Sequence, residues 1–383
     1  YADEAVSTSE QPLESSSTTT EDINHLVREA GVYAADAALP SAETEKPAAE
    51  AVAPETSPTR TEASSTTADH PAISETEKPK ATAEKVADLP TNEEKQLRPK
   101  EVKFDTWDDL LKWEPGKRVD DDMNRASVPL ASRFQGKQIN EQANPEAKIQ
   151  ALSNMNSKAK DHASVGGEEF KAYAFDYWQY LDSMVFWEGL VPSADVIDAA
   201  HRNGVPIYGT IFYNWSSSIK DQEHFAETLK EDSEGSKTFP IARKLVELAK
   251  YYGFDGYFIN QETTGNLVEP LGPKLRDFLL YTKEYAKSLN YPIKYSWYDA
   301  MTYEYGRYHE NALGEYNYNF MQPENGENPV DTFFANFNWG KSEVDYSIST
   351  AKWIHRNPYD VLAGLELQKG GSYKTNVDWN AIL

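Results

Sequence analysis

A helix, a turn residue and a short strand follow one another repeatedly in the second half of this sequence, and this order constrains the fold most. Residues 193–203 are helical in pattern, Gly204 ends the helix, and the β-branched and aromatic run 205–212 follows. The same order recurs at residues 241–252 and 256–260. Because a helix between two strands lets them run parallel, the pattern predicts a parallel sheet covered by helices.

Further segments extend the pattern to seven strands. Helical runs at residues 275–289 and 348–355 each precede another strand-like run. The predicted strands are residues 127–131, 183–187, 205–212, 256–260, 291–298, a run that begins near residue 332, and residues 360–366. The last five begin about 28 to 51 residues apart, a spacing that suits βα units.

The size of this region favours a (β/α)8 TIM barrel. Such a barrel takes about 250 residues, and residues 101–383 provide 283. We expect the closing eighth strand to lie beyond Leu383, so that the barrel is truncated before its last strand and the chain alone is unstable or weakly active. The alternative is an open doubly wound sheet, which usually carries a glycine-rich phosphate loop, and neither GxGxxG nor GxxxxGK[ST] occurs.

Residues 1–100 have a different composition. They contain 20 acidic and 9 basic residues, one glycine and two aromatic residues, Tyr1 and Tyr33. Ser, Thr, Pro, Ala and Glu dominate them, and such sequence cannot bury enough apolar surface to offset chain entropy. We predict a disordered low-complexity linker at 1–100. It resembles the stalks of Gram-positive surface proteins, so we expect a secreted or cell-surface protein, with possible cell-wall attachment through regions outside this chain.

Charge and residue usage exclude several classes of function. The formal net charge of −24 disfavours nucleic acids and anionic lipid surfaces as partners. No stretch approaches the roughly 18 apolar residues of a membrane span, so we expect no membrane insertion. Cysteine is absent, and the seven histidines form neither HxH nor HExxH. We therefore expect no disulfides, no thiol nucleophile, no metal site and no cofactor.

The end of the run 256–260 carries the strongest candidate site. Asn260 and Glu262 are two residues apart, so in an extended strand both side chains lie on one face. In a barrel, they would project from the C-terminal mouth, where catalytic groups lie. The alternative is a structural pair that hydrogen-bonds to loops. As catalysts, Asn260 would hold a substrate acetamido group while Glu262 serves as acid and base, so that the sugar's own 2-acetamido oxygen is the nucleophile.

Several stretches together resemble family-85 glycoside hydrolases, the endo-β-N-acetylglucosaminidases. The stretches are LLKW (110–113), VPLASR (128–133), YWQYLD (177–182), AHRNGVPIYGT (200–210), GFDGYFINQE (253–262) and FANFNW (334–339). The resemblance implies that residues 101–383 are a glycoside hydrolase catalytic domain, incomplete at its C-terminus. The family carries an N-x-E pair at the end of its fourth strand, which favours residues 127–131 as the first strand.

The resemblance also implies residue roles and a reaction. Glu262 would be the general acid/base, and Asn260 and Tyr298 would position the 2-acetamido group. The implied activity is that of a mannosyl-glycoprotein endo-β-N-acetylglucosaminidase, which hydrolyses the GlcNAc-β1,4-GlcNAc bond of the N-glycan core with retention, through an oxazolinium intermediate. Transglycosylation is expected as a side reaction, and N-linked glycans of glycoproteins are the expected partners.

Aromatic and polar residues at predicted strand ends are candidates for sugar binding. Indole faces stack on sugar C–H faces, and amides or carboxylates bond to hydroxyls. The candidates are Trp178, Trp215, Trp297, Trp339, Asn336, Asn338 and Glu366. Ordinary barrel packing is the alternative for each tryptophan. We assign Trp107, Trp113 and Trp353 to the core.

Two other functions remain open. A chitinase-like hydrolase would share the mechanism, but chitinases of the DxxDxDxE type place Asp two residues before the acid, where this sequence has Asn260. A non-catalytic carbohydrate-binding adhesin would use the barrel as a lectin and the linker as a stalk.

Overall fold

The computed structural model describes residues 102–118, 121–133, 140–153, 175–187, 189–367 and 378–382. The predicted linker at residues 1–100 lies outside these ranges and stays a prediction.

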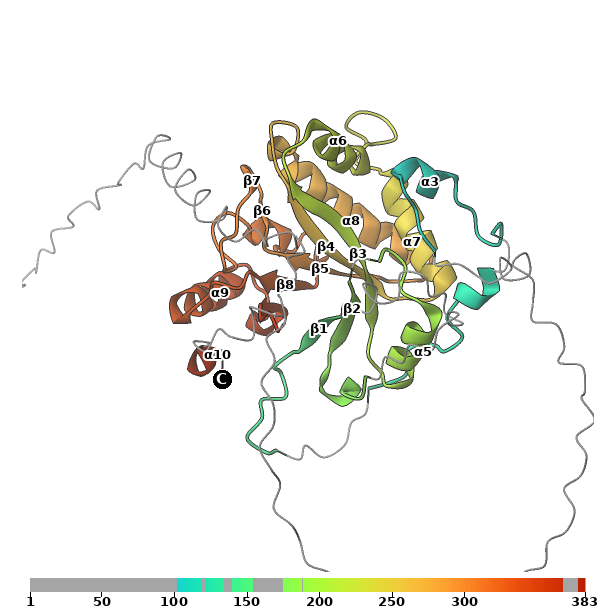
Figure 1. The fold of residues 1–383 in the computed structure, drawn as a ribbon. Helices are drawn as coiled ribbons and strands as arrows, with labels where there is room; N and C mark the ends of the chain where they lie inside the picture. Colours follow the sequence, from blue (N-terminus) through green and yellow to red (C-terminus); the bar gives the residue numbers. More distant parts are fainter. Residues whose placement is uncertain are drawn as a thin grey trace, which may run out of the picture. The chain divides into compact units, whose positions relative to one another are not determined.

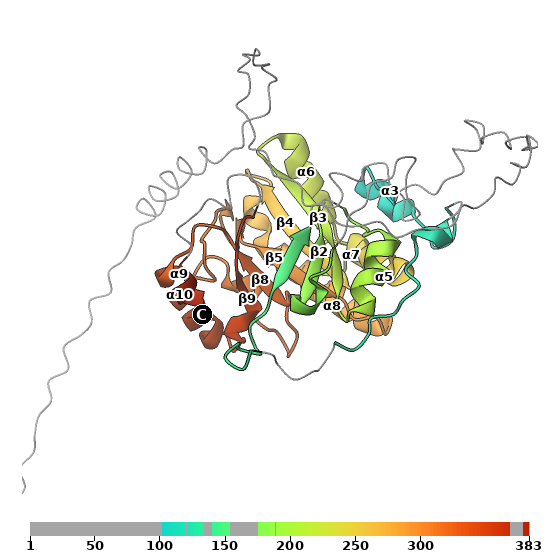
Figure 2. The same cartoon turned by 60° about the horizontal axis from the view of Figure 1, so that its bottom comes forward.

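In the described part of the chain, seven parallel strands form one nearly closed barrel, in the order β1-β2-β3-β4-β5-β8-β9 (Figures 1 and 2). Their bounds are β1 Gln150–Ser153, β2 Ser183–Phe186, β3 Ile207–Ser216, β4 Gly256–Thr263, β5 Lys294–Tyr298, β8 Thr332–Ala335 and β9 Val361–Ala363. A two-stranded antiparallel hairpin, β6 Met301–Thr302 and β7 Gly306–Arg307, follows β5. The predicted (β/α)8 barrel is confirmed, and the described residues contain seven of its strands and not the eighth.

The two outer strands, β1 and β9, are bridged by side chains at one end. Lys148 forms an ion pair with Asp360. Asn144 donates a hydrogen bond to the hydroxyl of Tyr359. Strands β1 and β9 are at the two ends of the strand order, and no pairing between them occurs in the described residues. Side chains therefore hold the two edges of the sheet near each other.

Helices cover the outside of the sheet (Figure 1). They are α3 Trp107–Lys112, α5 Ala194–Arg202, α6 Ile219–Thr228, α7 Pro240–Tyr252, α8 Gly272–Ser288, α9 Lys341–Trp353 and α10 Trp379–Ile382. Short 3-10 turns are η1 Asp121–Asn124, η2 Trp178–Tyr180, η3 Glu269–Leu271, η4 Tyr318–Phe320 and η5 Pro358–Asp360.

The unit α7–β4 shows how the sequence makes this arrangement. Proline at the first position favours the start of α7, and Gly253 ends it in the left-handed region at φ 88°. Gly256 then begins β4, where a Cβ atom would lie 1.9 Å from the carbonyl oxygen of Lys294 on β5. Only glycine permits this close approach of the two strands.

Alternation along the strands divides the apolar residues into two cores. The larger core lies between the strands and the helices, and it includes Tyr257, whose hydroxyl donates to the Leu245 carbonyl oxygen of α7 at 2.6 Å. The smaller core fills the barrel interior. Its buried members are Val185, Tyr208, Phe258, Tyr298, Ala300 and Phe334.

The predicted first strand, residues 127–131, is wrong. These residues belong to no sheet, and Val128 lies in a bend. The backbone N–H groups of Ser127 and Val128 donate to the Asp198 carboxylate of α5 at 2.8 and 3.0 Å. Pro129 has no N–H group that could hydrogen-bond to a neighbouring strand. The first strand is β1, so β4 is still the fourth.

Two boundaries near the C-terminus also differ from the prediction. Helix α9 begins at Lys341, seven residues before the predicted start at residue 348, and β9 ends at Ala363 rather than at residue 366. Trp353, which we assigned to the core, is instead 63% exposed at the end of α9, where its ring meets that of Tyr318 edge-on at 5.0 Å. Trp107 and Trp113 are buried as predicted.

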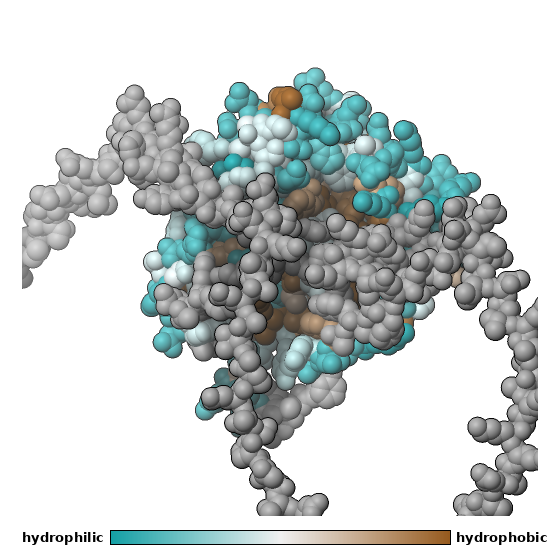
Figure 3. Space-filling view, in the orientation of Figure 1, coloured by the Kyte–Doolittle hydropathy of each residue, from teal (hydrophilic) through white to brown (hydrophobic). Residues whose placement is uncertain are grey.

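Most of the coloured surface in Figure 3 is hydrophilic, with separate hydrophobic areas near its centre. Among the described residues, no helix combines the length and the apolar composition needed to cross a lipid bilayer.

Candidate active site

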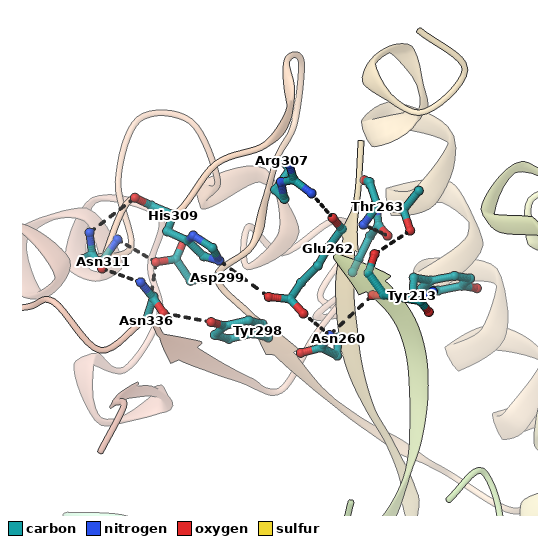
Figure 4. Close-up of polar contacts among 12 residues, drawn as sticks. Tyr213, Asn260, Glu262, Thr263, Tyr298, Asp299, Arg307, His309, Asn311 and Asn336 are labelled. Atoms are coloured by element: carbon teal, nitrogen blue, oxygen red, sulfur yellow. Dashed lines mark hydrogen bonds and ion pairs between the residues drawn. The ribbon is translucent and has the colours of Figure 1, made fainter. Parts of the chain in front are cut away.

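Strand β4 brings Asn260 and Glu262 to the C-terminal mouth of the barrel (Figure 4). The amide Nδ2 of Asn260 donates to Oε2 of Glu262 at 2.9 Å, and it also lies 3.5 Å from the Tyr213 carbonyl oxygen of β3. Since both partners accept, Oδ1 of Asn260 is left as the acceptor of this amide. The predicted pair thus lies together on one face.

The end of β4 is held by its own side chains and by β3. Gln261 is fully buried and its Nε2 donates to the Thr263 carbonyl oxygen at 2.8 Å, while its Oε1 accepts from the Thr263 N–H at 3.1 Å. The hydroxyl of Thr263 donates to the Asn214 carbonyl oxygen at 2.9 Å. These bonds hold the C-terminal end of β4, which carries Glu262, in an extended conformation.

Burial raises the pKa of the Glu262 carboxyl above its ordinary value, although the bond from Asn260 and the charge of Arg307 oppose that shift. A carboxyl group with a raised pKa keeps its proton at a higher pH. It can then act as a general acid and, once ionised, as a base.

Three residues that the sequence analysis did not connect gather around Glu262. Arg307 on β7 donates from Nη1 to the Glu262 carbonyl oxygen at 2.9 Å, and its guanidinium carbon lies 3.5 Å from the ring centroid of Trp215. The imidazole of His309 stacks on Trp215 with centroids 5.7 Å apart, and its Nε2 is 4.0 Å from Oε1 of Glu262. Burial and the nearby Arg307 lower the pKa of His309 to about 4, so the ring is neutral at pH 7.

Tyr298, the third predicted catalytic residue, lies at the end of β5, the strand that pairs with β4 (Figure 4). Its hydroxyl donates to Oδ1 of Asn336 at 2.8 Å. Burial and the charges of Glu262, Asp299 and Glu366 raise the pKa of this phenol well above its ordinary value. The phenol is therefore a neutral hydrogen-bonding group that faces the Asn260–Glu262 pair.

Four of the predicted sugar-binding residues surround this mouth or the loops beside it. Trp215 ends β3 and is 43% exposed. Trp339 follows β8, is half-buried and donates from Nε1 to the Gly364 carbonyl oxygen at 2.7 Å. Asn338 is exposed, and Glu366 lies three residues past β9, near enough for its charge to act on Tyr298.

The other three predicted sugar-binding residues have different surroundings. Trp178 lies in η2, before β2 and not after it, and packs edge-on against Phe175 in the core. Trp297 is fully buried on β5 and stacks on Phe320 with centroids 4.3 Å apart. The strand-end position predicted for Trp178 is therefore wrong, whereas Trp297 does lie at the end of β5 but is packed in the core between strands and helices. Asn336 is buried, and its amide bonds to Tyr298 and Asn311.

An aromatic pair on the other side of the mouth escaped the sequence analysis. Phe212 on β3 is the register partner of Asn260 and is partly exposed. Its ring meets Trp187, which follows β2, edge-on at 5.6 Å. The alternation of residues 208, 210 and 212 along the predicted strand placed Phe212 on the interior face and was the signal available.

Within the described ranges, no three His, Cys, Asp or Glu side chains lie close enough together to hold a metal ion. The chemistry available at the mouth is thus a carboxyl group that exchanges a proton, with an amide and a phenol beside it that form hydrogen bonds.

Several known proteins are similar to this chain in sequence or structure. A sequence model of glycosyl hydrolase family 85 matches residues 154–383. The glycoside hydrolase domain of Endo-D from Streptococcus pneumoniae R6 is 74% identical, with a TM-score of 0.71, over 75% of this chain and 45% of that chain. A cytosolic endo-beta-N-acetylglucosaminidase of Danio rerio is 29% identical over 280 residues, which are 70% of this chain and 36% of the relative.

The human cytosolic endo-beta-N-acetylglucosaminidase is 26% identical over 249 residues, 64% of this chain and 31% of that protein. The chain thus spans about a third of the length of the curated relatives it matches.

Proposed function

Because the chain belongs to glycosyl hydrolase family 85, we propose that it is an endo-β-N-acetylglucosaminidase that cleaves the GlcNAc-β1,4-GlcNAc bond of N-linked glycans. The observation that carries this proposal is the Asn260–Glu262 pair at the end of β4, joined at 2.9 Å, with Tyr298 facing it. An amide beside a single carboxyl group suits a substrate that brings its own nucleophile.

The first step of the proposed reaction breaks the glycosidic bond. The carbonyl oxygen of the substrate's 2-acetamido group attacks C1 of the same sugar, and the bond from C1 to the leaving oxygen breaks. The carboxyl group of Glu262 gives its proton to that oxygen, so the leaving sugar departs neutral. Oδ1 of Asn260 accepts the acetamido N–H and stabilises the positive charge of the oxazolinium that forms.

The second step returns the enzyme to its first state. The carboxylate of Glu262 takes a proton from a water molecule, whose oxygen attacks C1 and opens the oxazolinium ring. Two inversions at C1 give net retention, and Glu262 is protonated again. A sugar hydroxyl in place of the water would give transglycosylation.

Incubation with an N-glycosylated protein, followed by intact-mass measurement, tests this function. We expect the protein to lose its glycan and keep one GlcNAc. Glu262→Gln and Asn260→Ala should both lose turnover while retaining the melting temperature of the parent chain. Complete removal of the glycan, or binding without turnover, would contradict the proposal, and the second outcome would support the adhesin reading.

The mechanism has a separate test. A matched pair of substrates, one with the 2-acetamido group and one with a 2-hydroxyl, should differ in rate by orders of magnitude, because only the first contains the nucleophile. Equal rates, or a trapped covalent bond between sugar and protein, would rule out substrate assistance.

The location of the protein outside the cell also belongs to this proposal. Support comes from the composition of residues 1–100, whereas the curated relatives that match are named as cytosolic proteins. Fractionation of the producing cells, with antibody detection of the chain in the medium and in the wall fraction, tests it. Recovery in the cytosol alone would contradict it.

A further inference from the structure

Two asparagine side chains orient the hydroxyl of Tyr298, and the backbone fixes the first of them. The N–H of Asn338 lies 3.2 Å from one side-chain atom of Asn311. A backbone N–H only donates, so that atom is the oxygen Oδ1. The other atom, Nδ2, is 3.3 Å from the His309 carbonyl oxygen, which only accepts. Both backbone partners thus require the same orientation of the Asn311 amide.

The orientation of the Asn311 amide determines that of the Asn336 amide. Oδ1 of Asn311 also lies 2.8 Å from the Asn336 side chain, so the Asn336 atom there must be the donor Nδ2. Oδ1 of Asn336 then points the opposite way, to the hydroxyl of Tyr298 at 2.8 Å. A carbonyl oxygen accepts, so Tyr298 gives its only hydroxyl proton to Asn336 and presents lone pairs to the mouth (Figure 4).

The buried carboxyl group of Asp299 holds both asparagines in place. Oδ2 of Asp299 accepts from the N–H of Asn311 at 2.6 Å and from the N–H of Asn336 at 3.3 Å. Asn311 has φ 59°, a left-handed conformation that Asn adopts more readily than most residues. The loop after β7 and the end of β8 are therefore joined beneath Tyr298 before any substrate arrives.

We propose that Asn311 is a positioning residue that acts through Asn336 to keep the Tyr298 hydroxyl a hydrogen-bond acceptor toward the substrate. This inference rests on the proposed function. To turn the hydroxyl toward the substrate as a donor would leave the Oδ1 of buried Asn336 without its donor, which costs the desolvation of that oxygen.

The consequence concerns the nucleophile. Asn260 also presents only its Oδ1, because its Nδ2 is committed to Glu262 and to the Tyr213 carbonyl oxygen. An acetamido group between two acceptors is held by its N–H, and its carbonyl oxygen receives no donor from either residue. A hydrogen bond to that oxygen would withdraw electron density from the attacking atom, so this arrangement keeps the nucleophile reactive.

A double-mutant cycle tests the inference. Gly tolerates a positive φ and removes the Asn311 amide, so Asn311→Gly should lower kcat on an N-glycopeptide about tenfold, the scale of one transition-state hydrogen bond. In the Tyr298→Phe background, where no hydroxyl remains, the same change should lower kcat by less than about twofold. Asn325→Gly is the matched control, since Asn325 has φ 51° in an exposed turn and contacts none of these residues.

Equal losses in both backgrounds would overturn the inference, because Asn311 would then support the loop and not the hydroxyl. If Asn311→Gly lowers the melting temperature strongly, Asn336→Leu takes its place in the cycle, with the same expected pattern. If neither this chain nor a longer one that completes the barrel cleaves a glycopeptide, the proposed function fails, and a neutron structure of the deuterated chain decides this inference separately. A deuteron on Tyr298 that points to Asn336 supports it, and one that points into the mouth refutes it.

Discussion

Replacement of His201 should destabilise the protein by an amount that depends on pH. His201 is 3% exposed on α5, and both ring nitrogens face acceptors: Nδ1 lies 2.7 Å from the Val128 carbonyl oxygen and Nε2 lies 2.7 Å from the Asp255 carboxylate. Two acceptors require two N–H groups, so the ring is an imidazolium. It joins the segment before β1 to the start of β4.

The size of the expected loss of stability depends on the contacts that Asp255 keeps after His201 is replaced. Breaking a buried ion pair costs about 3–5 kcal/mol. Asp255 keeps its bond from the Ile207 N–H at 2.8 Å, and its side chain is 18% exposed. We therefore expect His201→Ala to lower the free energy of unfolding by about 3 kcal/mol near pH 6, at the lower end of that range.

The sign of the pH dependence follows from the pKa. Burial alone would lower the pKa of His201, but the bond and charge of Asp255, with the Val128 carbonyl oxygen, raise it above its ordinary value. A group with a raised folded-state pKa stabilises the fold fully below its unfolded pKa, and this stabilisation is lost as pH rises through the folded pKa. The difference between parent and variant should therefore shrink from pH 6 toward pH 9.

Urea denaturation of both chains at pH 6, 7, 8 and 9, followed by circular dichroism, measures this difference. His355→Asn is the control, since His355 is exposed with φ 58°, and it should change the stability by no more than about 0.5 kcal/mol. A difference that stays constant or grows with pH would show that the His201 ring is neutral and would refute the reasoning.

Three other changes have expected outcomes. Gly256→Ala would place a Cβ 1.9 Å from a backbone oxygen of β5 and should cost at least about 1–3 kcal/mol, read as a lower melting temperature; an unchanged melting temperature would contradict the close approach. Asn260→Asp replaces a bond that lowers the pKa of Glu262 with a like charge, so the basic limb of the kcat/KM pH profile should move up by about one unit; no movement would count against Glu262 as the acid. Trp215→Ala should raise KM about threefold to tenfold while kcat changes little, and a loss confined to kcat would assign Trp215 another role.

The sequence predicted the centre of the barrel better than its edges. Asn260 and Glu262 were found because alternation on one strand is local, and because Gly253 ends α7 shortly before β4 begins at Gly256. The same alternation on β5 would have excluded Trp297 as a sugar-binding residue. Trp297 and Tyr298 are adjacent, so they point to opposite sides of the sheet, and only Tyr298 faces the mouth.

Residues that approach the site over long separations were not predictable from local pattern. Arg307 and His309 reach Glu262 because the hairpin β6–β7 folds back over the end of β4, more than forty residues along the chain. The first strand was misplaced for a similar reason. Residues 127–131 have a strand-like pattern, and only the distant Asp198 explains why their N–H groups avoid the sheet.

The strand order has a consequence for how heat or denaturant would take this molecule apart. Strand β4 is the midpoint of the ladder, with three strands on either side, and from β1 to β5 ladder neighbours are also neighbours along the chain. The two rims, by contrast, are tied through side chains such as Lys148 and Asp360, which are 212 positions apart. Closing so long a loop costs more entropy than pairing strands that follow one another in consecutive βα units, so the contact between β1 and β9 should break first on unfolding and form last on refolding. Asn260 and Glu262 lie on β4 in the middle of the sheet. They should therefore keep their distance from each other after β1 and β9 have separated.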